Sequence, residues 1–331
     1  MSSLLLLHSI QYAGFIGAQF TNSFLVYLIS TRAERLFGSY RHVMCTFAMF
    51  SLIYAWIEVF TQPVMHIFGP VFVVYMDSPL KSHPVIGDFV ICLYCGSFAL
   101  VISLLAAQFY YRYIALCRTT KLVRFEGKKL FKIFIPCLIC FFLWFQCVNY
   151  GMANTIEKQQ FLRKEILGMY DDDITKIPFI APMYWAMKDD VRIWNFFEII
   201  ASFGCVCIIL TCFTTIIVCA LNIYTTLKHE ASHLSTKTQE LNHQLFVTLM
   251  FQTLLPFVMM YAPVGLLFTL PFFEVGAGRL ANYTSASLAV YPCLEPIIAM
   301  FFIKDFRNAI IGIKRSGSIQ PINFTHRSSA F

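Results

Sequence analysis

The chain has 331 residues, of which 58% are hydrophobic and 13% charged, with a mean hydropathy of +0.66 and a formal net charge of +7. An ordinary soluble domain carries about 25% charged and 45–50% apolar residues, so this composition excludes most soluble folds and favours a protein dissolved in lipid. The positive charge does not indicate a nucleic-acid partner, because no run of Lys and Arg reaches five or six residues.

Seven segments are each long and apolar enough for a helix that crosses a bilayer, which needs about 20 mostly apolar residues. They predict an all-α membrane protein with a seven-transmembrane-helix bundle over residues 1–303. The expected spans are, in chain order, 10–30, 43–63, 89–113, 130–151, 195–221, 244–270 and 280–303.

The distribution of Lys and Arg predicts the orientation of this bundle. If the N-terminus is extracellular, 17 of the 25 basic residues fall on the cytoplasmic side, and the short outer loops are nearly free of them. Cytoplasmic loops carry an excess of Lys and Arg, so we expect an extracellular N-terminus and a cytoplasmic C-terminus. The longest connection, residues 152–194, is then extracellular.

The segment after the seventh span has an amphipathic pattern. Ile303, Phe306, Ile310 and Ile313 recur at helical spacing, with basic residues that include Lys304 and Arg307 between them. The pattern predicts a basic helix over 304–315 on the inner membrane surface. Residues 316–331 are expected to form a disordered cytoplasmic tail.

The inner end of the third span carries Tyr111, Arg112 and Tyr113. This triplet resembles the Asp-Arg-Tyr switch of rhodopsin-like receptors, with Tyr111 in place of the acid. We expect Arg112 and Tyr113 to act in coupling to a partner inside the cell. The alternative is that Arg112 is a basic anchor at the inner membrane face. The expected docking surface around it is Arg118, Lys121 and Lys228.

Four prolines lie in the last two spans, Pro256 and Pro263 in the sixth and Pro292 and Pro296 in the seventh. Each removes a backbone hydrogen bond and kinks the helix. Kinked helices can pivot and so provide the two-state element that a transmembrane signal needs. The alternative is that membrane helices simply tolerate proline.

The outer halves of the spans predict a pocket for a ligand, because pockets between helices are mostly apolar with a few polar groups. Glu295 lies deeper, as a switch residue or a hydrogen-bonded core acid. The candidate lining residues are Trp56, Glu58, Tyr94, Phe98, Glu198, Phe257, Tyr261 and Phe268, with Gln108 and Gln252 deeper. No base in these outer halves would balance an acidic ligand, and an unpaired buried carboxylate costs several kcal/mol. We therefore expect a small neutral ligand, with a protonated amine facing Glu58 or Glu198 as second choice.

Two cysteine and histidine patterns bear on other functions. Residues 229–233 match the H-E-x-x-H pattern of zinc proteases, but catalytic zinc needs a third protein ligand, and His243 is the only nearby candidate. We expect no metal, no cofactor and no enzyme activity, and keep a seven-span zinc protease as an alternative. Cys92 and Cys95 cannot form a disulfide to residues 152–194, which contain no cysteine.

The segments 251–256 (FQTLLP), 291–296 (YPCLEP) and 304–307 (KDFR), together with 54–58 (YAWIE), resemble the str family of nematode seven-transmembrane chemoreceptors. The resemblance runs from end to end and weakens in the long outer loop and the tail. It implies an odorant receptor in the membrane of sensory cilia, with a small volatile ligand, a heterotrimeric G protein and membrane lipid as partners. An odorant-gated channel of inverted topology is a further alternative.

Overall fold

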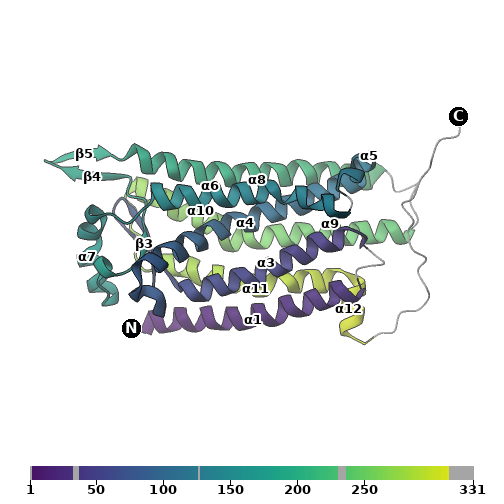
Figure 1. Ribbon diagram of the computed structural model, residues 1–331, viewed down its shortest axis with the longest axis horizontal. Helices are drawn as coiled ribbons and strands as arrows, with labels where there is room; N and C mark the ends of the chain where they lie inside the picture. The colour runs from purple at the N-terminus through teal and green to yellow at the C-terminus, as the bar shows by residue number, and fades with distance from the viewer. Residues whose placement is uncertain (1, 33–36, 126, 230–235, 313–331) are drawn as a thin grey trace.

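The computed structural model describes residues 2–32, 37–125, 127–229 and 236–312. Within these ranges seven helical spans lie side by side along the longest axis of the molecule (Figure 1). The predicted seven-helix bundle is thereby confirmed. Its long helices are α1 (Ser2–Arg32), α3 (Tyr40–Thr61), α4 (Pro84–Cys117), α6 (Ile135–Gly151), α8 (Phe196–His229), α9 (Thr236–Pro256) continued by α10 (Ala262–Thr269), and α11 (Ala281–Phe302).

Six of these spans are long and apolar enough to cross a membrane, and α1 falls outside that group. Gln11, Gln19 and Asn22 lower the hydropathy of α1. Two of these side chains face protein, because Gln11 and Asn22 are fully buried. At Gly14 an added Cβ would meet the backbone of Ala289, so α1 lies directly against α11 in the way that small residues allow in membrane bundles.

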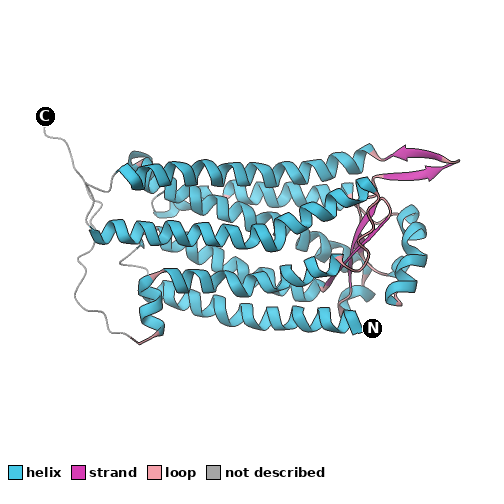
Figure 2. Cartoon of the chain, turned by 180° about the vertical axis from the view of Figure 1, so that it is seen from behind, coloured by secondary structure: helices cyan, strands magenta, loops and turns pink. Residues whose placement is uncertain are grey.

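A cap of short elements covers the end of the bundle at which α1 begins, and Figure 2 shows strands only at this end of the described chain. Strands β1 (Pro63–Phe68), β2 (Val71–Met76) and β3 (Phe179–Ile180) form an antiparallel sheet in that order. The rest of the cap is η1 (Pro79–Ser82), α7 (Ile156–Tyr170), η4 (Ile174–Lys176) and a hairpin of β4 (Trp185–Lys188) and β5 (Val191–Trp194).

The second span begins and ends a few residues earlier than the sequence predicts. Helix α3 ends at Thr61, Gln62 adopts a left-handed conformation with φ of 43°, and Pro63 begins β1. Proline has no N–H to donate and is tolerated at the first residue of a strand. The helix therefore ends two residues before the expected boundary and turns into the cap.

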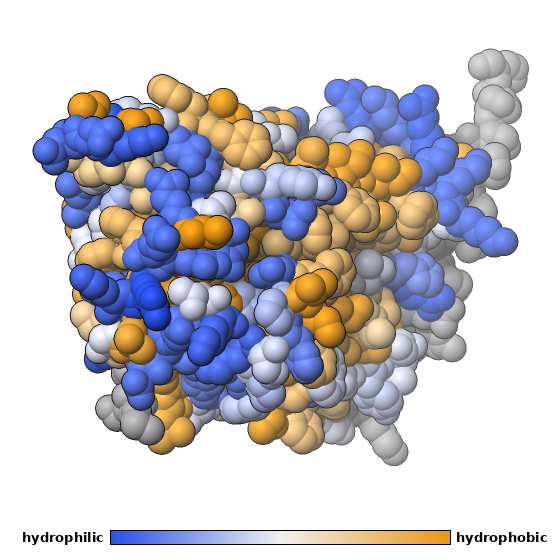
Figure 3. Space-filling view, turned by 60° about the vertical axis from the view of Figure 1, so that its left-hand side comes forward, coloured by the Kyte–Doolittle hydropathy of each residue, from blue (hydrophilic) through white to orange (hydrophobic). Residues whose placement is uncertain are grey.

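The opposite end of the bundle carries α5 (Thr119–Leu122), η2 (Val123–Phe125), η3 (Gly127–Ile133) and α12 (Lys304–Ile310). In Figure 3 hydrophilic residues gather over the cap, while hydrophobic residues cover much of the flank of the helices behind it. Exposed side chains of the spans α1, α6 and α8 include Phe20, Phe142 and Phe203. Such a surface suits a bilayer, and the chain is a membrane protein.

Helix α12 differs from the predicted membrane-surface helix in what its apolar residues contact. Ile303 and Phe306 are fully buried in the bundle, and Phe306 meets Phe37 edge to face with ring centroids 6.0 Å apart. Ile310 remains 49% exposed. The helix ends at Ile310, while Ile313 and the predicted tail lie outside the described residues. Protein contacts therefore fix the start of this helix.

The prolines of the last two spans act differently from one another. Pro256 ends α9 and is followed by a π-helical turn, Phe257–Tyr261, whereas α11 continues through Pro292 and Pro296. A proline leaves the carbonyl four residues earlier without its helical donor. Two such carbonyls are satisfied from neighbouring helices, as membrane helices require. Asn22 Nδ2 donates to Pro292 O at 2.8 Å, and Ser287 donates to Met259 O.

Candidate functional site

An apolar cavity of about 40 Å³ lies between the helices at the cap end of the bundle. The sheet of the cap forms one wall and four spans form the others. The sheet contributes Met65, Phe72, Val74 and Ile180. The helices contribute Tyr94, Cys95 and Phe98 from α4; Trp144 and Val148 from α6; Val264 and Phe268 from α10; and Leu288 from α11. Met152, just after α6, completes the lining. A water molecule occupies about 30 Å³ of the liquid, so an organic ligand enters only if side chains move.

Aromatic side chains connect this cavity with the π-helical turn. Phe98 packs against Trp144 on one side, with ring centroids 5.5 Å apart, and against Tyr261 on the other at 4.7 Å. The Tyr261 hydroxyl donates to the backbone oxygen of Phe98 at 3.1 Å. Offset aromatic pairs at such distances stabilise by about 0.5–1.5 kcal/mol beyond the area they bury. Phe98 is therefore in direct contact with Tyr261 of the π-helical turn, and a displacement of Phe98 would change that contact.

Three buried polar groups lie beside the cavity wall at Tyr54, Glu58 and Tyr94, each no more than 2% exposed. The Tyr54 and Tyr94 rings stack with centroids 6.1 Å apart, and Glu58 lies near both hydroxyls. Neither the hydroxyls nor the carboxyl oxygens of Glu58 make a well-formed hydrogen bond with any part of the described chain. Buried polar groups are normally hydrogen-bonded, so this corner can accept a polar partner.

The structure brings together only some of the residues expected to line the pocket. Tyr94, Phe98 and Phe268 surround the cavity, and Tyr261 packs behind Phe98. Trp56 and Phe257 lie on the outside of the bundle, with 46% and 45% of their surface exposed. Both side chains therefore face the lipid side of their helices. Counting apolar residues locates a span but does not predict which of its side chains face inward.

Glu198 has a partner within the protein. Its Oε1 atom lies 2.9 Å from Lys158 Nζ of α7, it accepts from Asn195 Nδ2 at 2.7 Å, and its second oxygen accepts from the backbone N–H of Met183. Burial lowers the pKa of Lys158, and Glu198 opposes that effect. This buried ion pair attaches α7 of the cap to α8, so Glu198 has a structural partner within the protein.

The cap has no disulfide, because all twelve cysteines are free. Hydrogen bonds and ion pairs hold it instead. Lys81 Nζ lies 2.6 Å from Asp77 and 3.0 Å from Asp172, and His8 Nε2 lies 3.0 Å from Asp77. The buried His66 joins β1 to α7 through Tyr170, whose hydroxyl lies 3.1 Å from Nδ1.

At the other end of the bundle Arg112 is 7% exposed and lies among three helices. Its Nη2 atom donates to Asn242 Oδ1 of α9 at 3.0 Å, and its guanidinium lies 5.2 Å from the ring centroid of Tyr40 in α3. The Tyr40 hydroxyl donates to Gln108 Oε1 at 3.3 Å. Arg112 is thus a buried cross-link between α3, α4 and α9, with an amide and an aromatic ring in place of an acid.

Gln108 and Gln252 do not reach the cavity. Gln108 belongs to the Tyr40 and Arg112 contacts, and Gln252 donates to Glu295. Glu295 is fully buried in α11, and its second carboxyl oxygen has no hydrogen-bond partner in the described ranges. The amide of Gln252 therefore connects the sixth span to the seventh. Gln252 lies one turn before Pro256, and Glu295 lies directly before Pro296.

The residues expected to face an intracellular partner surround this end of the bundle. Arg118, Lys121, Lys228 and Arg307 are exposed, and Tyr113 is partly buried. Arg118 Nε donates to the Tyr113 hydroxyl at 3.2 Å, and Lys304 Nζ pairs with Glu240 of α9 at 3.1 Å. Of the H-E-x-x-H segment only His229 is described, at the end of α8; the other four positions lie outside the described residues.

The sequence analysis missed the residues of the cap that wall the cavity, and Trp144. The signal for the cap is a pair of mostly apolar runs, PVMHIF and VFVVYM, on either side of Gly69 and Pro70. Such runs around a turn indicate a β-hairpin, and this hairpin folds back over the helices. Trp144 could have been found as the polar-tipped aromatic in a span otherwise rich in Phe and Cys.

Seven helical spans with a small cavity at one end and a buried arginine cross-link at the other form the architecture of a seven-transmembrane receptor. The chain belongs to the family described as serpentine type 7TM GPCR chemoreceptor Str, which it matches over residues 7–311.

Named relatives cover nearly the whole chain. It is 29% identical to serpentine receptor class r-10 of Caenorhabditis elegans over 94% of this chain and 92% of the relative. It is 27% identical to serpentine receptor class r-10 of Caenorhabditis briggsae, over 98% and 96%. The G-protein coupled receptor str-33 of C. elegans is 23% identical over 89% and 87%. The protein is a nematode-type chemosensory G-protein-coupled receptor, similar to proteins named as receptors.

Proposed function

We propose that this receptor binds a small neutral volatile compound from the extracellular side and activates a heterotrimeric G protein in sensory cilia. The cavity beneath the cap carries the proposal. Its walls are apolar, and the corner behind them holds Tyr54, Glu58 and the Tyr94 hydroxyl, which make no well-formed hydrogen bond within the described residues. A ketone, ester or alcohol would gain contact area from the walls and one or two hydrogen bonds from this corner.

The charge of the site favours a neutral ligand over an acid. Lys158, which is buried in the cap, is already paired with Glu198. A carboxylate ligand would thus be buried without a counter-charge, which costs several kcal/mol. A protonated amine held by Glu58 is the second candidate, because neither oxygen of Glu58 makes a well-formed hydrogen bond within the described residues.

The coupling step of the proposal follows the packed contacts between the two ends. A ligand that displaces Phe98 or Phe268 changes the support of Tyr261 in the π-helical turn. Gln252 and Glu295 join the sixth and seventh spans just below this turn, and Asn242 on the same span holds Arg112. A pivot of the sixth span would release Arg112 toward the G protein.

The proposal is tested by expression in a heterologous cell with a calcium or cyclic-nucleotide readout, challenged with a panel of volatile compounds. We expect responses to neutral compounds that disappear when G-protein nucleotide exchange is blocked. A current that survives this block would favour a ligand-gated channel. Strong activation by a carboxylate, undiminished at a pH at which it is fully ionised, would refute the neutral-ligand assignment.

The orientation is tested separately. An epitope placed before Leu4 should be stained on intact cells, and one placed after Phe331 only after permeabilisation. The reverse pattern would place the cap inside the cell and would overturn both the ligand site and the G-protein assignment.

A further inference from the structure

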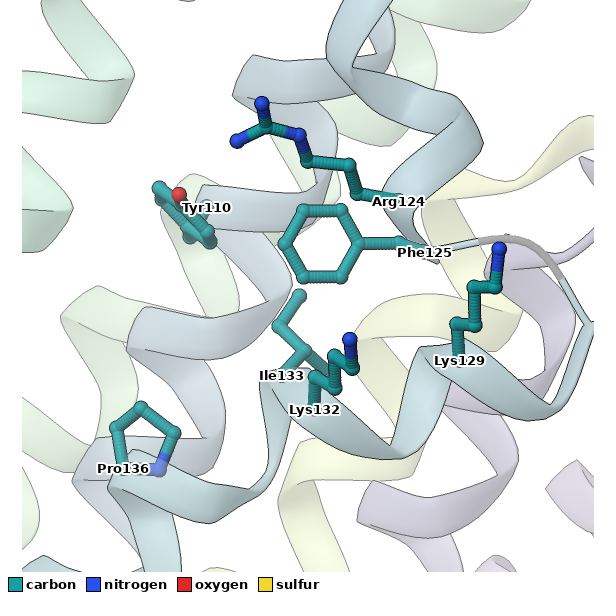
Figure 4. A pocket seen from close by; sticks show the side chains of 7 residues that line it. All are labelled: Tyr110, Arg124, Phe125, Lys129, Lys132, Ile133 and Pro136. Carbon is teal, nitrogen blue, oxygen red and sulfur yellow. The ribbon is translucent and has the colours of Figure 1, made fainter.

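A second site lies at the end of the bundle away from the cap, between the end of α4 and the beginning of α6. It is an open groove of about 570 Å³ (Figure 4), within the range of ligand pockets in proteins. Three of its lining residues are basic and the others are aromatic or apolar. They are Arg124, Lys129 and Lys132, with Tyr110, Phe125, Ile133 and Pro136.

The three cations of the groove are available to a ligand. Arg124, Lys129 and Lys132 are exposed, and none pairs with an acid within the described part of the chain. Figure 4 shows them on η2 and η3, on either side of the Phe125 ring. The whole connection from 118 to 132 contains six basic residues and one acid, Glu126, which lies outside the described residues. The groove is therefore suited to an anion with more than one negative charge.

The surroundings of the groove indicate that this anion belongs to a lipid. Its neighbours on the flank of the bundle are large apolar side chains that face outward. Phe131 is 61% exposed, Ile135 43% and Tyr110 39%. Tyr110 and Phe125 meet edge to face with centroids 6.2 Å apart and form an apolar floor. A ligand that fills the groove thus has its charge against the cations and its apolar part along the flank where acyl chains lie.

We propose that this groove binds an inner-leaflet phospholipid whose headgroup carries phosphate monoesters. Basic pockets at the cytoplasmic ends of membrane helices recognise such headgroups, and the cytoplasmic leaflet supplies anionic lipid. The guanidinium of Arg124 can donate two hydrogen bonds to one phosphate, and the ammonium groups of Lys129 and Lys132 can pair with the other phosphates of the headgroup. The site rests on the proposed orientation of the bundle, which places this end in the cytoplasm, and it is separate from the ligand cavity.

The test uses the full-length receptor in detergent micelles, with native mass spectrometry to count bound short-chain phosphatidylinositol bisphosphate. The variant Arg124→Gln/Lys129→Gln/Lys132→Gln should weaken binding at least tenfold, since each basic residue near the headgroup contributes roughly 1 kcal/mol. The matched control Arg32→Gln/Lys121→Gln/Lys128→Gln removes the same charge at the same end but outside the groove, and should change binding less than about twofold.

Three outcomes would overturn the proposal. Equal losses in the two triple variants would show non-specific attraction. Binding of the free inositol trisphosphate headgroup as tightly as the lipid would identify a soluble phosphate as the ligand. A groove variant that keeps its native lipid affinity would show that the lipid does not bind in the groove. Unchanged thermal unfolding of both variants shows that they are folded, and lipid binding is measured without any signalling readout.

Discussion

Two clusters of buried polar groups differ in their hydrogen bonding, one beside the cavity at the cap end and one around Arg112. Near the cap, Tyr54, Tyr94 and Glu58 are buried without well-formed partners and stand beside an apolar cavity. At the other end, Arg112 is held by Asn242 and Tyr40. Groups that are already paired fix one arrangement of the helices, whereas unpaired ones gain most from a ligand. Under the proposed function, the first cluster receives the ligand and the contacts of Arg112 hold the resting state.

The largest expected effect is on the attachment of the cap. Lys158→Ala leaves Glu198 buried without its cation, and breaking a buried pair from one side costs about 3–5 kcal/mol. The thermal unfolding midpoint of the purified receptor should fall steeply. Lys304→Ala is the control, because its pair with Glu240 is 54% exposed on both sides and such pairs contribute at most about 1 kcal/mol.

A compensating change sharpens this prediction. Glu198→Gln keeps the side-chain length and one oxygen that can accept from the backbone N–H of Met183, and it removes the charge. Combined with Lys158→Met it should recover most of the lost stability, since a neutral pair leaves no buried charge. If the double variant is no more stable than Lys158→Ala, the ion pair is not what attaches the cap.

The second effect is on signalling through the inner cross-link. Arg112→Ala should reach the membrane and bind ligand, yet its maximal response should fall roughly tenfold or more. The variant loses the hydrogen bonds that the released guanidinium would make to the G protein, and hydrogen bonds to charged groups contribute about 1.5–3 kcal/mol. Asn242→Asp should act in the opposite sense, since a carboxylate partner strengthens the contact and lowers ligand-independent activity. A dose–response curve left unchanged by Arg112→Ala would reduce this arginine to a membrane anchor.

The smallest effect is the response of the cap to acid. Burial lowers the pKa of His66 and Arg279 acts in the same direction, while Glu165 beside it opposes them; Tyr170 is its other hydrogen-bond partner. The unfolded chain then binds more protons than the folded one, so stability is complete above about pH 6.5 and declines as pH falls below it.

The slope of this decline cannot exceed about 1.4 kcal/mol per pH unit for one group. It is measured as the unfolding midpoint of the purified receptor between pH 7 and 5. The decline should be smaller in His66→Gln, and the exposed His83→Gln should behave like the native chain. A native-like slope in His66→Gln would exclude His66 as its source.

The sequence predicts the bundle but not its cap. Apolar segments of bilayer length locate seven spans because a lipid solvent imposes one requirement on every helix. Glu198 and Lys158 are 40 residues apart in the chain, and their pairing depends on how α7 folds back, which no local pattern specifies. The same limit explains why Trp56 and Phe257 were assigned to the pocket, because the inward face of a helix is set by its neighbours.

The inner end was predictable in its residues and not in its contacts. Arg112 stands out from its aromatic neighbours and its position at the end of a span. Its partner Asn242 lies 130 residues away on a helix whose inner part is polar on several faces. Gln252 and Glu295 likewise appear in the sequence as two isolated polar residues, and only the packing of α9 against α11 makes them a pair.

The central claim is that the cavity beneath the cap is where the ligand acts. The direct measurement is the dose–response to an activating neutral volatile in Val264→Phe, whose larger side chain would fill the cavity. The matched control is Val258→Phe, because Val258 lies in the same span and is 58% exposed. With equal surface expression, Val264→Phe should raise the effective concentration by at least tenfold, because overpacking costs about 1–3 kcal/mol, while Val258→Phe should stay close to native. Equal responses in the two variants would contradict the assignment of the cavity as the ligand site.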